Sequence, residues 1–192
     1  GYYEQAGLNR YGWEHTVKVM NPQSADLGVM RATLLFGGLE SIKRNINRKA
    51  HNLKFFEVGN CYWFNEQKHS PEAPIKAYTQ DYHMALWVTG KRVEGSWAHP
   101  DEDSSVYELK AYVENIFRRV GVPQGMFVEK TSDNNIFDKA ITIENHGGKI
   151  IAEYGIVNHK ILKSFDIEQQ VFYADIDWQA LMKAVRKNKL EF

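Results

Sequence analysis

The chain has 192 residues and is 43% hydrophobic, which is enough apolar material for the core of one compact module. Its 24 Lys and Arg balance 24 Asp and Glu, and this net charge of zero argues against a dedicated nucleic-acid binder. The single cysteine, Cys61, excludes a disulfide framework and a cysteine-rich zinc site, and no apolar stretch is long enough to span a bilayer. We therefore expect residues 1–192 to form one module of a longer cytoplasmic protein.

The first elements are a short strand and a helix. Residues 16–20 alternate like a strand, which stops at Pro22 because proline disfavours a helical predecessor. From Leu34 the apolar residues recur at three- and four-residue spacing, which predicts an amphipathic helix ending near His51. Gly37 and Gly38 weaken this helix, so they suggest close approach by another backbone.

An aromatic block follows at 53–65. Its β-compatible residues predict two strands, with Gly59 and Asn60 forming the turn between them. The charged, proline-containing stretch 66–80 is typical of a surface loop, and the next strand is expected at 82–90.

A second helix is predicted after the loop that carries residues 95–103. Ser104 or Ser105 begins this helix, with Ser104 as the candidate N-cap, and Gly121 and Pro123 end it.

The remaining chain consists mainly of short strands with tight connections. Residues 145–148, Asn-His-Gly-Gly, predict a hairpin turn, and tight turns favour antiparallel pairing. The fold class is therefore α+β, with an antiparallel sheet flanked by helices. The predicted strands are 126–130, 140–144, 149–157 and 170–177, and the predicted helices are 160–164 and 178–188.

No catalytic or metal-binding motif is evident. The His-Pro-Asp-Glu-Asp run at 99–103 could bind a hard cation, but acidic residues before a helix also stabilise its positive N-terminal end, and we favour that interpretation. The seven histidines lack zinc-ligand spacing, and the glycine pairs match neither phosphate-loop pattern. Cys61 has no CxxC partner or basic neighbour, which favours a buried core thiol.

A basic run on the first helix could contact RNA phosphates, although a solvated helix face explains it equally well. Its candidate contact residues are Lys43, Arg44, Arg48 and Lys49.

Several segments, in order and spacing, resemble the β subunit of bacterial phenylalanyl-tRNA synthetase. They comprise an NP turn, a Met-Arg pair, a leucine-glycine helix and an F-E-x-G strand, and the segments 107–122 and 152–181 are also similar. The matching positions are Asn21, Pro22, Met30, Arg31, Leu34, Leu35, Gly38, Leu39, Asn45, Arg48, Phe56, Glu57 and Gly59.

The resemblance implies a catalytic-like module with the fold of class II aminoacyl-tRNA synthetases. A working class II site would need an arginine on the ATP α-phosphate after the F-E-x-G strand, and a second arginine near a late glycine-rich strand. No arginine occurs between Arg48 and Arg92, and no GxGxxR follows the strand at 152–157. We therefore expect no catalytic residue, metal or cofactor in this chain, whereas the full complex uses ATP and magnesium.

The resemblance also implies a scaffolding role. The partners would be the catalytic α subunit in an assembly of two α and two β chains, the remaining β-subunit domains and, through the full complex, tRNA(Phe). Two alternatives remain: a free-standing class II-like enzyme that adenylates a carboxylic acid, and an RNA-binding module. The residues expected to face the α subunit are Met30, Arg31, Leu35, Leu39, Ile42 and Ile46.

Overall fold

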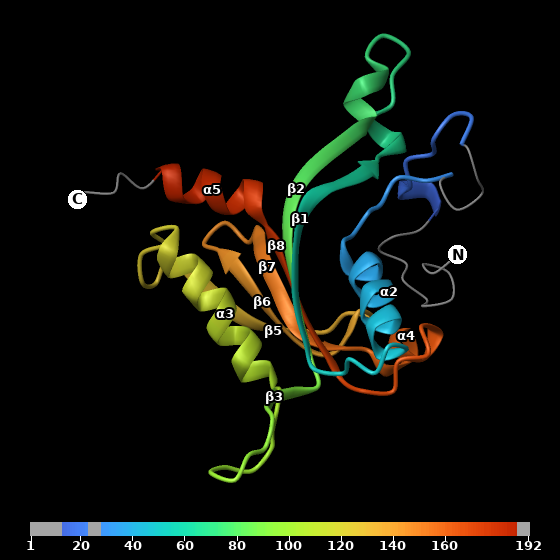
Figure 1. Cartoon of the computed structure of the whole chain (residues 1–192). Helices are drawn as coiled ribbons and strands as arrows, with labels where there is room; N and C mark the ends of the chain where they lie inside the picture. Colours follow the sequence, from blue (N-terminus) through green and yellow to red (C-terminus); the bar gives the residue numbers. More distant parts are fainter. Residues whose placement is uncertain (1–12, 23–27, 188–192) are drawn as a thin grey trace.

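A computed structural model describes residues 13–22 and 28–187 and shows a six-stranded sheet with helices on both faces (Figure 1). Every pair of neighbouring strands is antiparallel, as the tight turns predict. In spatial order the strands are β1 (Leu53–Phe64), β2 (Tyr78–Thr89), β8 (Val171–Asp177), β7 (Ile150–Val157), β6 (Phe137–Asn145) and β5 (Phe127–Ser132).

The helices divide between the two faces of the sheet (Figure 1). One face carries α2 (Leu35–Ile46) and α4 (His159–Ser164), and the other carries α3 (Val106–Arg119) and α5 (Trp178–Lys187). This arrangement confirms the α+β class. Within the described ranges, no helix is both long enough and apolar enough to cross a bilayer.

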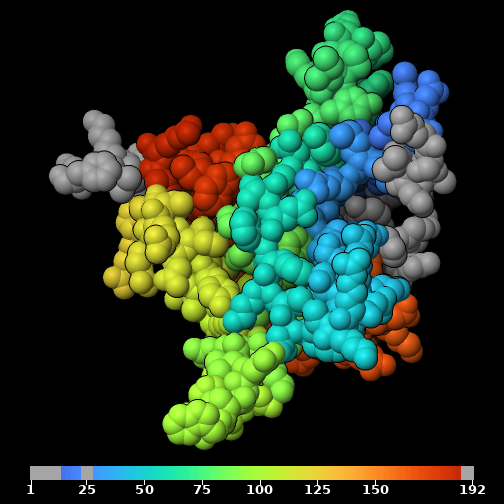
Figure 2. Space-filling model, in the orientation of Figure 1, coloured from blue at the N-terminus to red at the C-terminus, as the bar shows by residue number. Residues whose placement is uncertain are grey.

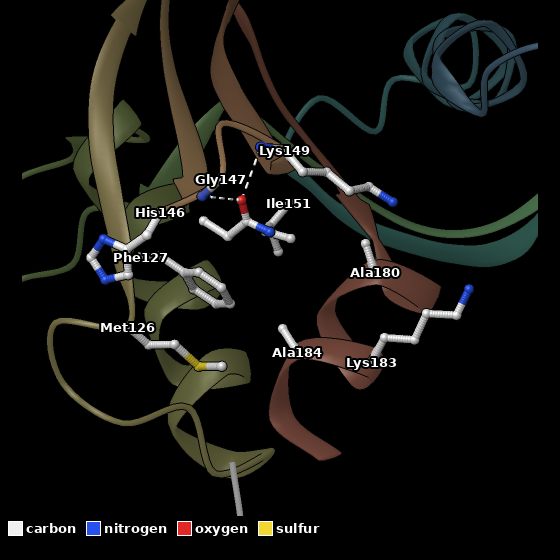
Figure 3. A pocket seen from close by; sticks show the side chains of 10 residues that line it. Met126, Phe127, His146, Gly147, Lys149, Ile151, Ala180, Lys183 and Ala184 are labelled. Carbon is white, nitrogen blue, oxygen red and sulfur yellow. Dashed lines mark hydrogen bonds between the residues drawn. The ribbon is translucent and has the colours of Figure 1, made fainter. Parts of the chain in front are cut away.

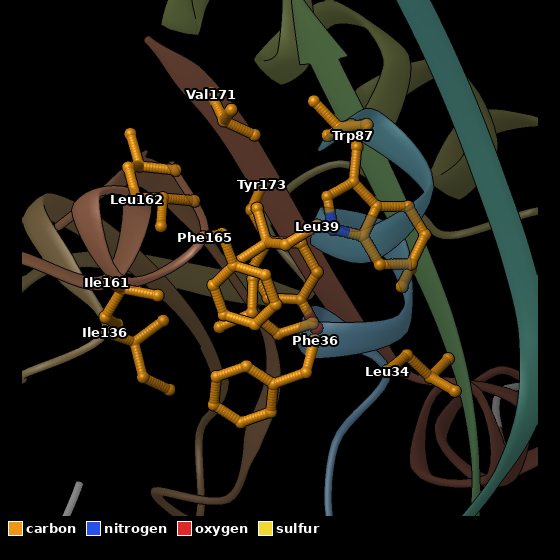
Figure 4. Packing of buried hydrophobic residues seen from close by; sticks show 14 of the residues in the cluster. Leu34, Phe36, Leu39, Trp87, Ile136, Ile161, Leu162, Phe165, Val171 and Tyr173 are labelled. Atoms are coloured by element: carbon orange, nitrogen blue, oxygen red, sulfur yellow. The ribbon is translucent and has the colours of Figure 1, made fainter. Parts of the chain in front are cut away.

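The core between the sheet and α2 is built around two aromatic rings of neighbouring strands (Figure 4). Trp87 of β2 and Tyr173 of β8 are directly opposite in the register, and their ring centroids lie 5.4 Å apart. Leu39 of α2 and Phe165, which follows α4, complete this layer. The apolar stripe of α2 thus packs against its own sheet.

A second core fills the opposite face. Leu109 and Val113 of α3 and Leu181 of α5 are fully buried there. They pack with Val88 and Phe172, the neighbours of Trp87 and Tyr173 along β2 and β8, because successive strand side chains alternate between faces. The sheet is therefore apolar on both sides over this stretch.

Helix α2 differs from its prediction in two respects. It begins at Leu35 but ends at Ile46 rather than near His51, and the following turn includes Lys49 at φ +64°. The tight approach at Gly38 is confirmed, but the neighbour is the Trp87 indole rather than a backbone: a Cβ at Gly38 would lie 2.1 Å from a ring carbon. A Cβ at Gly37 would lie 3.9 Å from Glu57 Oε2, which is an ordinary van der Waals distance.

The predicted strand pair at 53–65 is wrong, because β1 is one continuous strand of 12 residues. Gly59 and Asn60 pair with His83 and Tyr82 of β2 in unbroken register. The glycine serves a different purpose from a turn, since a Cβ at Gly59 would lie 2.0 Å from the Arg31 guanidinium. Strand β2 accordingly starts at Tyr78, four residues before its prediction.

Smaller differences concern the connections. The predicted strand 16–20 forms an isolated bridge between Lys18 and Val29, and Ser105 rather than Ser104 caps α3. The hairpin at 145–148 is confirmed, with Gly148 at φ +77°. The last predicted helix reaches residue 188, which lies outside the described residues. Elements without a prediction are η2 (Trp13–His15), η4 (Glu66–Lys68), η5 (Pro74–Ala77), β3 (Lys91–Val93) and β4 (Glu102–Asp103).

Candidate functional site

Three of the residues expected to face a partner are buried inside the chain itself. Leu35, Leu39 and Ile42 each have 0% exposed surface and lie in the core between α2 and the sheet. They have no surface left to contact another subunit, so the interface prediction is wrong for these three. The helical periodicity identified an apolar face correctly, but that face packs against β1, β2 and β8.

The other three expected interface residues lie nearer the surface. Arg31 is exposed, forms an ion pair with Glu57 and donates from Nε to the carbonyl of Asn60 at 3.0 Å. The Tyr62 amide donates to the Arg31 carbonyl at 2.9 Å. These contacts hold the segment before α2 against the edge of β1, whereas Met30 and Ile46 are half-buried.

The segment before α2 also presents apolar side chains to solvent. A short antiparallel ladder forms there, with the Val19 amide bonded to the Gly28 carbonyl at 3.0 Å and the Met30 amide to the Val17 carbonyl at 2.8 Å. Val19 and Met20 are 40% and 89% exposed. We call Val19, Met20 and Met30 the approach patch.

The candidate RNA-contact residues lie around the C-terminal end of α2. Lys43 pairs with Asp166, Nζ to Oδ2 at 2.7 Å, so its charge is neutralised locally. Arg44, Arg48 and Lys49 are exposed and have no ion pair within the described part of the chain. Three of the four predicted residues are therefore surface cations.

A strip of ionisable side chains crosses the sheet on the α2 side, beyond the Trp87–Tyr173 layer. One row joins Glu57, Ala85, Asp175 and Glu153 across β1, β2, β8 and β7. The next row pairs His83 with Asp177. We define the polar strip as Glu57, Asp81, His83, Glu153, Asp175 and Asp177.

Three cations of the described residues reach the polar strip, and each is paired with one of its carboxylates. Arg31 pairs with Glu57, and Lys149 Nζ lies 3.2 Å from Asp177 Oδ2. His83 Nδ1 lies 2.8 Å from Asp175 Oδ1. These three cations are therefore already engaged by carboxylates, and the carboxylates of the strip disfavour an anion such as a triphosphate.

The ionisation of His83 follows from this arrangement. Burial of the ring alone would lower the pKa of His83, but the hydrogen bond and charge of Asp175 outweigh burial, and the pKa is raised. Cys61 lies next to the strip and is 1% exposed, and its burial raises the thiol pKa to about 12. The prediction of a buried core cysteine is confirmed.

The acidic run 99–103 forms ion pairs within a projecting hairpin. Asp101 Oδ2 lies 2.6 Å from Lys91 Nζ, and Glu102 Oε1 lies 3.1 Å from Arg92 Nη1. These β3 cations, rather than the N-terminal end of α3, are the partners of the two carboxylates. Over the described residues, no group of three or more His, Cys, Asp or Glu side chains could hold a metal ion.

The polar strip is not among the sites predicted from the sequence, although the sequence contains a signal for it. Asp81 and His83, and likewise Asp175 and Asp177, are spaced by two within one strand, which places each pair on one face. The pairing of β2 with β8 cannot be read from this spacing, and it is the pairing that brings the two sets together.

The geometry defines a module with the class II aminoacyl-tRNA synthetase fold. A pyrrolysyl tRNA synthetase from Desulfitobacterium hafniense, PylSc, superposes with a TM-score of 0.59 at 13% identity, covering 90% of this chain and 54% of that one. A family model described as the phenylalanyl tRNA synthetase beta chain CLM domain matches residues 2–178. The chain belongs to this family, which confirms the resemblance found in the sequence.

Two relatives extend the comparison. The phenylalanine–tRNA ligase beta subunit of Bacteroides thetaiotaomicron is 53% identical over 191 residues, covering 100% of this chain. That of Porphyromonas gingivalis is 44% identical over 190 residues, covering 99%. In both cases the chain spans 23% of the length of the relative.

Proposed function

We propose that this chain is a non-catalytic module of a phenylalanyl-tRNA synthetase β subunit and that it docks on the catalytic α subunit. In this proposal the α subunit attaches phenylalanine to tRNA(Phe), and the full complex supplies the ATP and magnesium chemistry. The family match over residues 2–178 supports the class of module. A role in translation would place the protein in the cytoplasm.

The observation that carries the non-catalytic part of the proposal is the charge of the polar strip. Amino-acid activation needs cations aimed at the charge that develops on the phosphates. Here Arg31, His83 and Lys149 are each paired with a carboxylate, and the connection 65–77 between β1 and β2 contains no arginine. The carboxylates of such a site would repel the phosphates of ATP rather than stabilise them.

The docking part of the proposal is supported by the approach patch. Met20 is 89% exposed, and the contacts of Arg31 with Glu57 and Asn60 hold the segment that presents the patch. A large apolar side chain on a segment that backbone hydrogen bonds hold in place is suited to insertion into a partner pocket, where fully desolvated anchors dominate binding energy. This patch replaces the buried face of α2 as the proposed contact.

Co-purification with an α subunit tests the docking part. We expect the chain to bind α and the double variant Val19→Asp, Met20→Asp to lose at least tenfold in affinity, because two charges would be buried at the contact. The matched control is Tyr107→Asp on α3, where the side chain is 78% exposed on the other face of the sheet. Equal binding by wild type and the double variant would refute the docking surface.

Magnesium-dependent exchange of pyrophosphate into ATP tests the non-catalytic part. We expect no exchange above background from the isolated chain with any amino acid or related carboxylic acid. Exchange that disappears in a His83→Ala, Asp175→Ala variant would instead establish the alternative, a free-standing adenylating enzyme.

A further inference from the structure

Two cavities flank α5 on the outer face of the molecule. One of about 420 Å³ lies between α5 and the strands β1 and β2, and Figure 2 shows α5 beside these strands. The other, of about 520 Å³, lies between α5 and the β6–β7 hairpin (Figure 3). Lys183 lines both cavities, because it lies on the ridge of the helix between them.

The cavity beside β2 combines aromatic rings with amides. Trp178 and Tyr82 contribute the rings, and Tyr82 is 42% exposed. Asn60, Gln80 and Gln179 contribute carboxamides, which can donate to and accept from the edge of a nucleobase. An aromatic face next to such groups is the arrangement that holds an unstacked base.

The charge of the cavities favours an anion. Lys183 and Arg186 line the cavity beside β2 and have no ion pair among the residues that the structure describes. His146 lies at the other cavity together with the Phe127 ring (Figure 3), whereas Lys149, which also lines that cavity, is paired with Asp177 and adds no free charge. Within residues 13–22 and 28–187, no carboxylate lines either cavity. A chain with zero net charge thus has a local basic surface, and local charge decides binding at short range.

We propose that these cavities bind consecutive unpaired nucleotides of an RNA strand whose backbone crosses α5 at Lys183. The base beside β2 stacks on Tyr82 or Trp178, Lys183 and Arg186 contact phosphates, and the next base enters the cavity that contains Phe127. This site lies on the opposite face from Arg44, Arg48 and Lys49, and the inference is independent of docking on the α subunit.

Fluorescence anisotropy with a labelled eight-nucleotide single-stranded RNA of mixed sequence tests the proposal on the whole chain at 50 mM salt. The wild type should bind, and its affinity should fall with rising salt. Lys183→Ala and Arg186→Ala should each lower the slope of log affinity against log salt by about 0.7, the value for one phosphate contact on a single strand. Tyr82→Leu should weaken binding about 5- to 100-fold with the salt slope unchanged, because it removes a stacking surface and no charge.

The matched control is the double variant Lys160→Ala, Lys163→Ala, which removes two exposed cations from α4 on the other face of the sheet and should leave the affinity and the slope unchanged. Unlabelled AMP and a blunt RNA duplex of eight base pairs serve as competitors, and both should compete at least tenfold more weakly than the single strand. Thermal unfolding verifies that each variant is folded. Absence of wild-type binding, equal loss in the α4 control, or equal competition by AMP or duplex would overturn the proposal.

Discussion

Helices α2 and α5 are both amphipathic and lie on opposite faces of one sheet, yet they leave different surfaces exposed (Figure 1). Helix α2 buries Leu35, Leu39 and Ile42 completely. Helix α5 buries Leu181 and Val185 but leaves a cavity along each flank. The apolar stripe of a helix therefore indicates which side of the helix is buried. Only the tertiary structure shows whether the same chain fills the space around that side completely or leaves a cavity for a ligand.

The largest expected effect comes from truncating the buried side of α2. Leu39→Ala should lower the free energy of unfolding by about 2–5 kcal/mol, because it removes a side chain with 0% exposure and leaves a cavity beside Trp87. Lys183→Ala on α5 should change it by no more than about 0.5 kcal/mol. Urea denaturation of both variants measures this difference, and a loss below 1 kcal/mol at Leu39 would contradict the intramolecular role of α2.

Two neighbouring glycines of α2 test how closely this helix packs against the sheet. Gly38→Ala should destabilise the chain by about 1–3 kcal/mol, because the new methyl group would meet the rigid Trp87 indole. At Gly37 a new methyl group would make only an ordinary van der Waals contact with Glu57, so Gly37→Ala should stabilise the chain by up to about 1 kcal/mol through helix propensity. Thermal unfolding should therefore shift in opposite directions for the two variants, and a shift in the same direction would show that the indole does not lie against Gly38.

The two faces of the sheet also differ in their response to pH. On the α3 face, Glu108 is 8% exposed and lies 2.7 Å from Lys54 Nζ. Burial alone would raise the pKa of Glu108, but hydrogen bonds from Lys54 and Tyr112 outweigh it, and the pKa is lowered. The stability that this pair contributes is present above the ordinary glutamate pKa and is lost as pH falls through the lowered value.

Glu108→Gln should therefore reduce the loss of stability at acid pH. At neutral pH it should lower the free energy of unfolding by about 1 kcal/mol. Urea denaturation between pH 3 and pH 7 measures both quantities. If the free energy of unfolding of the variant falls with pH as steeply as that of the wild type, the pKa of Glu108 does not differ between the folded and unfolded states.

On the α2 face the dependence of stability on pH has the opposite sign. The pKa of His83 is raised, so its pair with Asp175 contributes stability below the ordinary histidine pKa and loses it as pH rises through the raised value. His83→Gln should remove this decline and lower stability in acid by less than about 1 kcal/mol. Proton NMR titration of the His83 ring checks the direction independently, and a midpoint below 6.5 would contradict it.

Local signals in the sequence were sufficient for much of the fold. Helices α3, α4 and α5 and the turn at Gly148 follow from periodicity and from the positive φ that glycine permits. Gly59 misled the prediction of β1, because a glycine that admits the Arg31 side chain looks identical in the sequence to a glycine in a turn. The polar strip and the cavities beside α5 depend on the pairing of distant strands, and no local pattern encodes that pairing.

The smallest expected effect concerns the charges of α2. Lys43 and Asp166 form an ion pair between side chains that are 40% and 80% exposed, and such pairs contribute about 0.2–1 kcal/mol. A double-mutant cycle of Lys43→Ala with Asp166→Ala should give a coupling at the low end of this range, and 0.5 M salt should reduce it further because exposed charges are screened. Arg44→Ala, which breaks no ion pair within the described residues, serves as the reference for a neutral change. A coupling above 1 kcal/mol would mean that charge as well as the apolar stripe holds α2 to the segment after α4, and that the contrast between α2 and α5 is one of electrostatics as much as of burial.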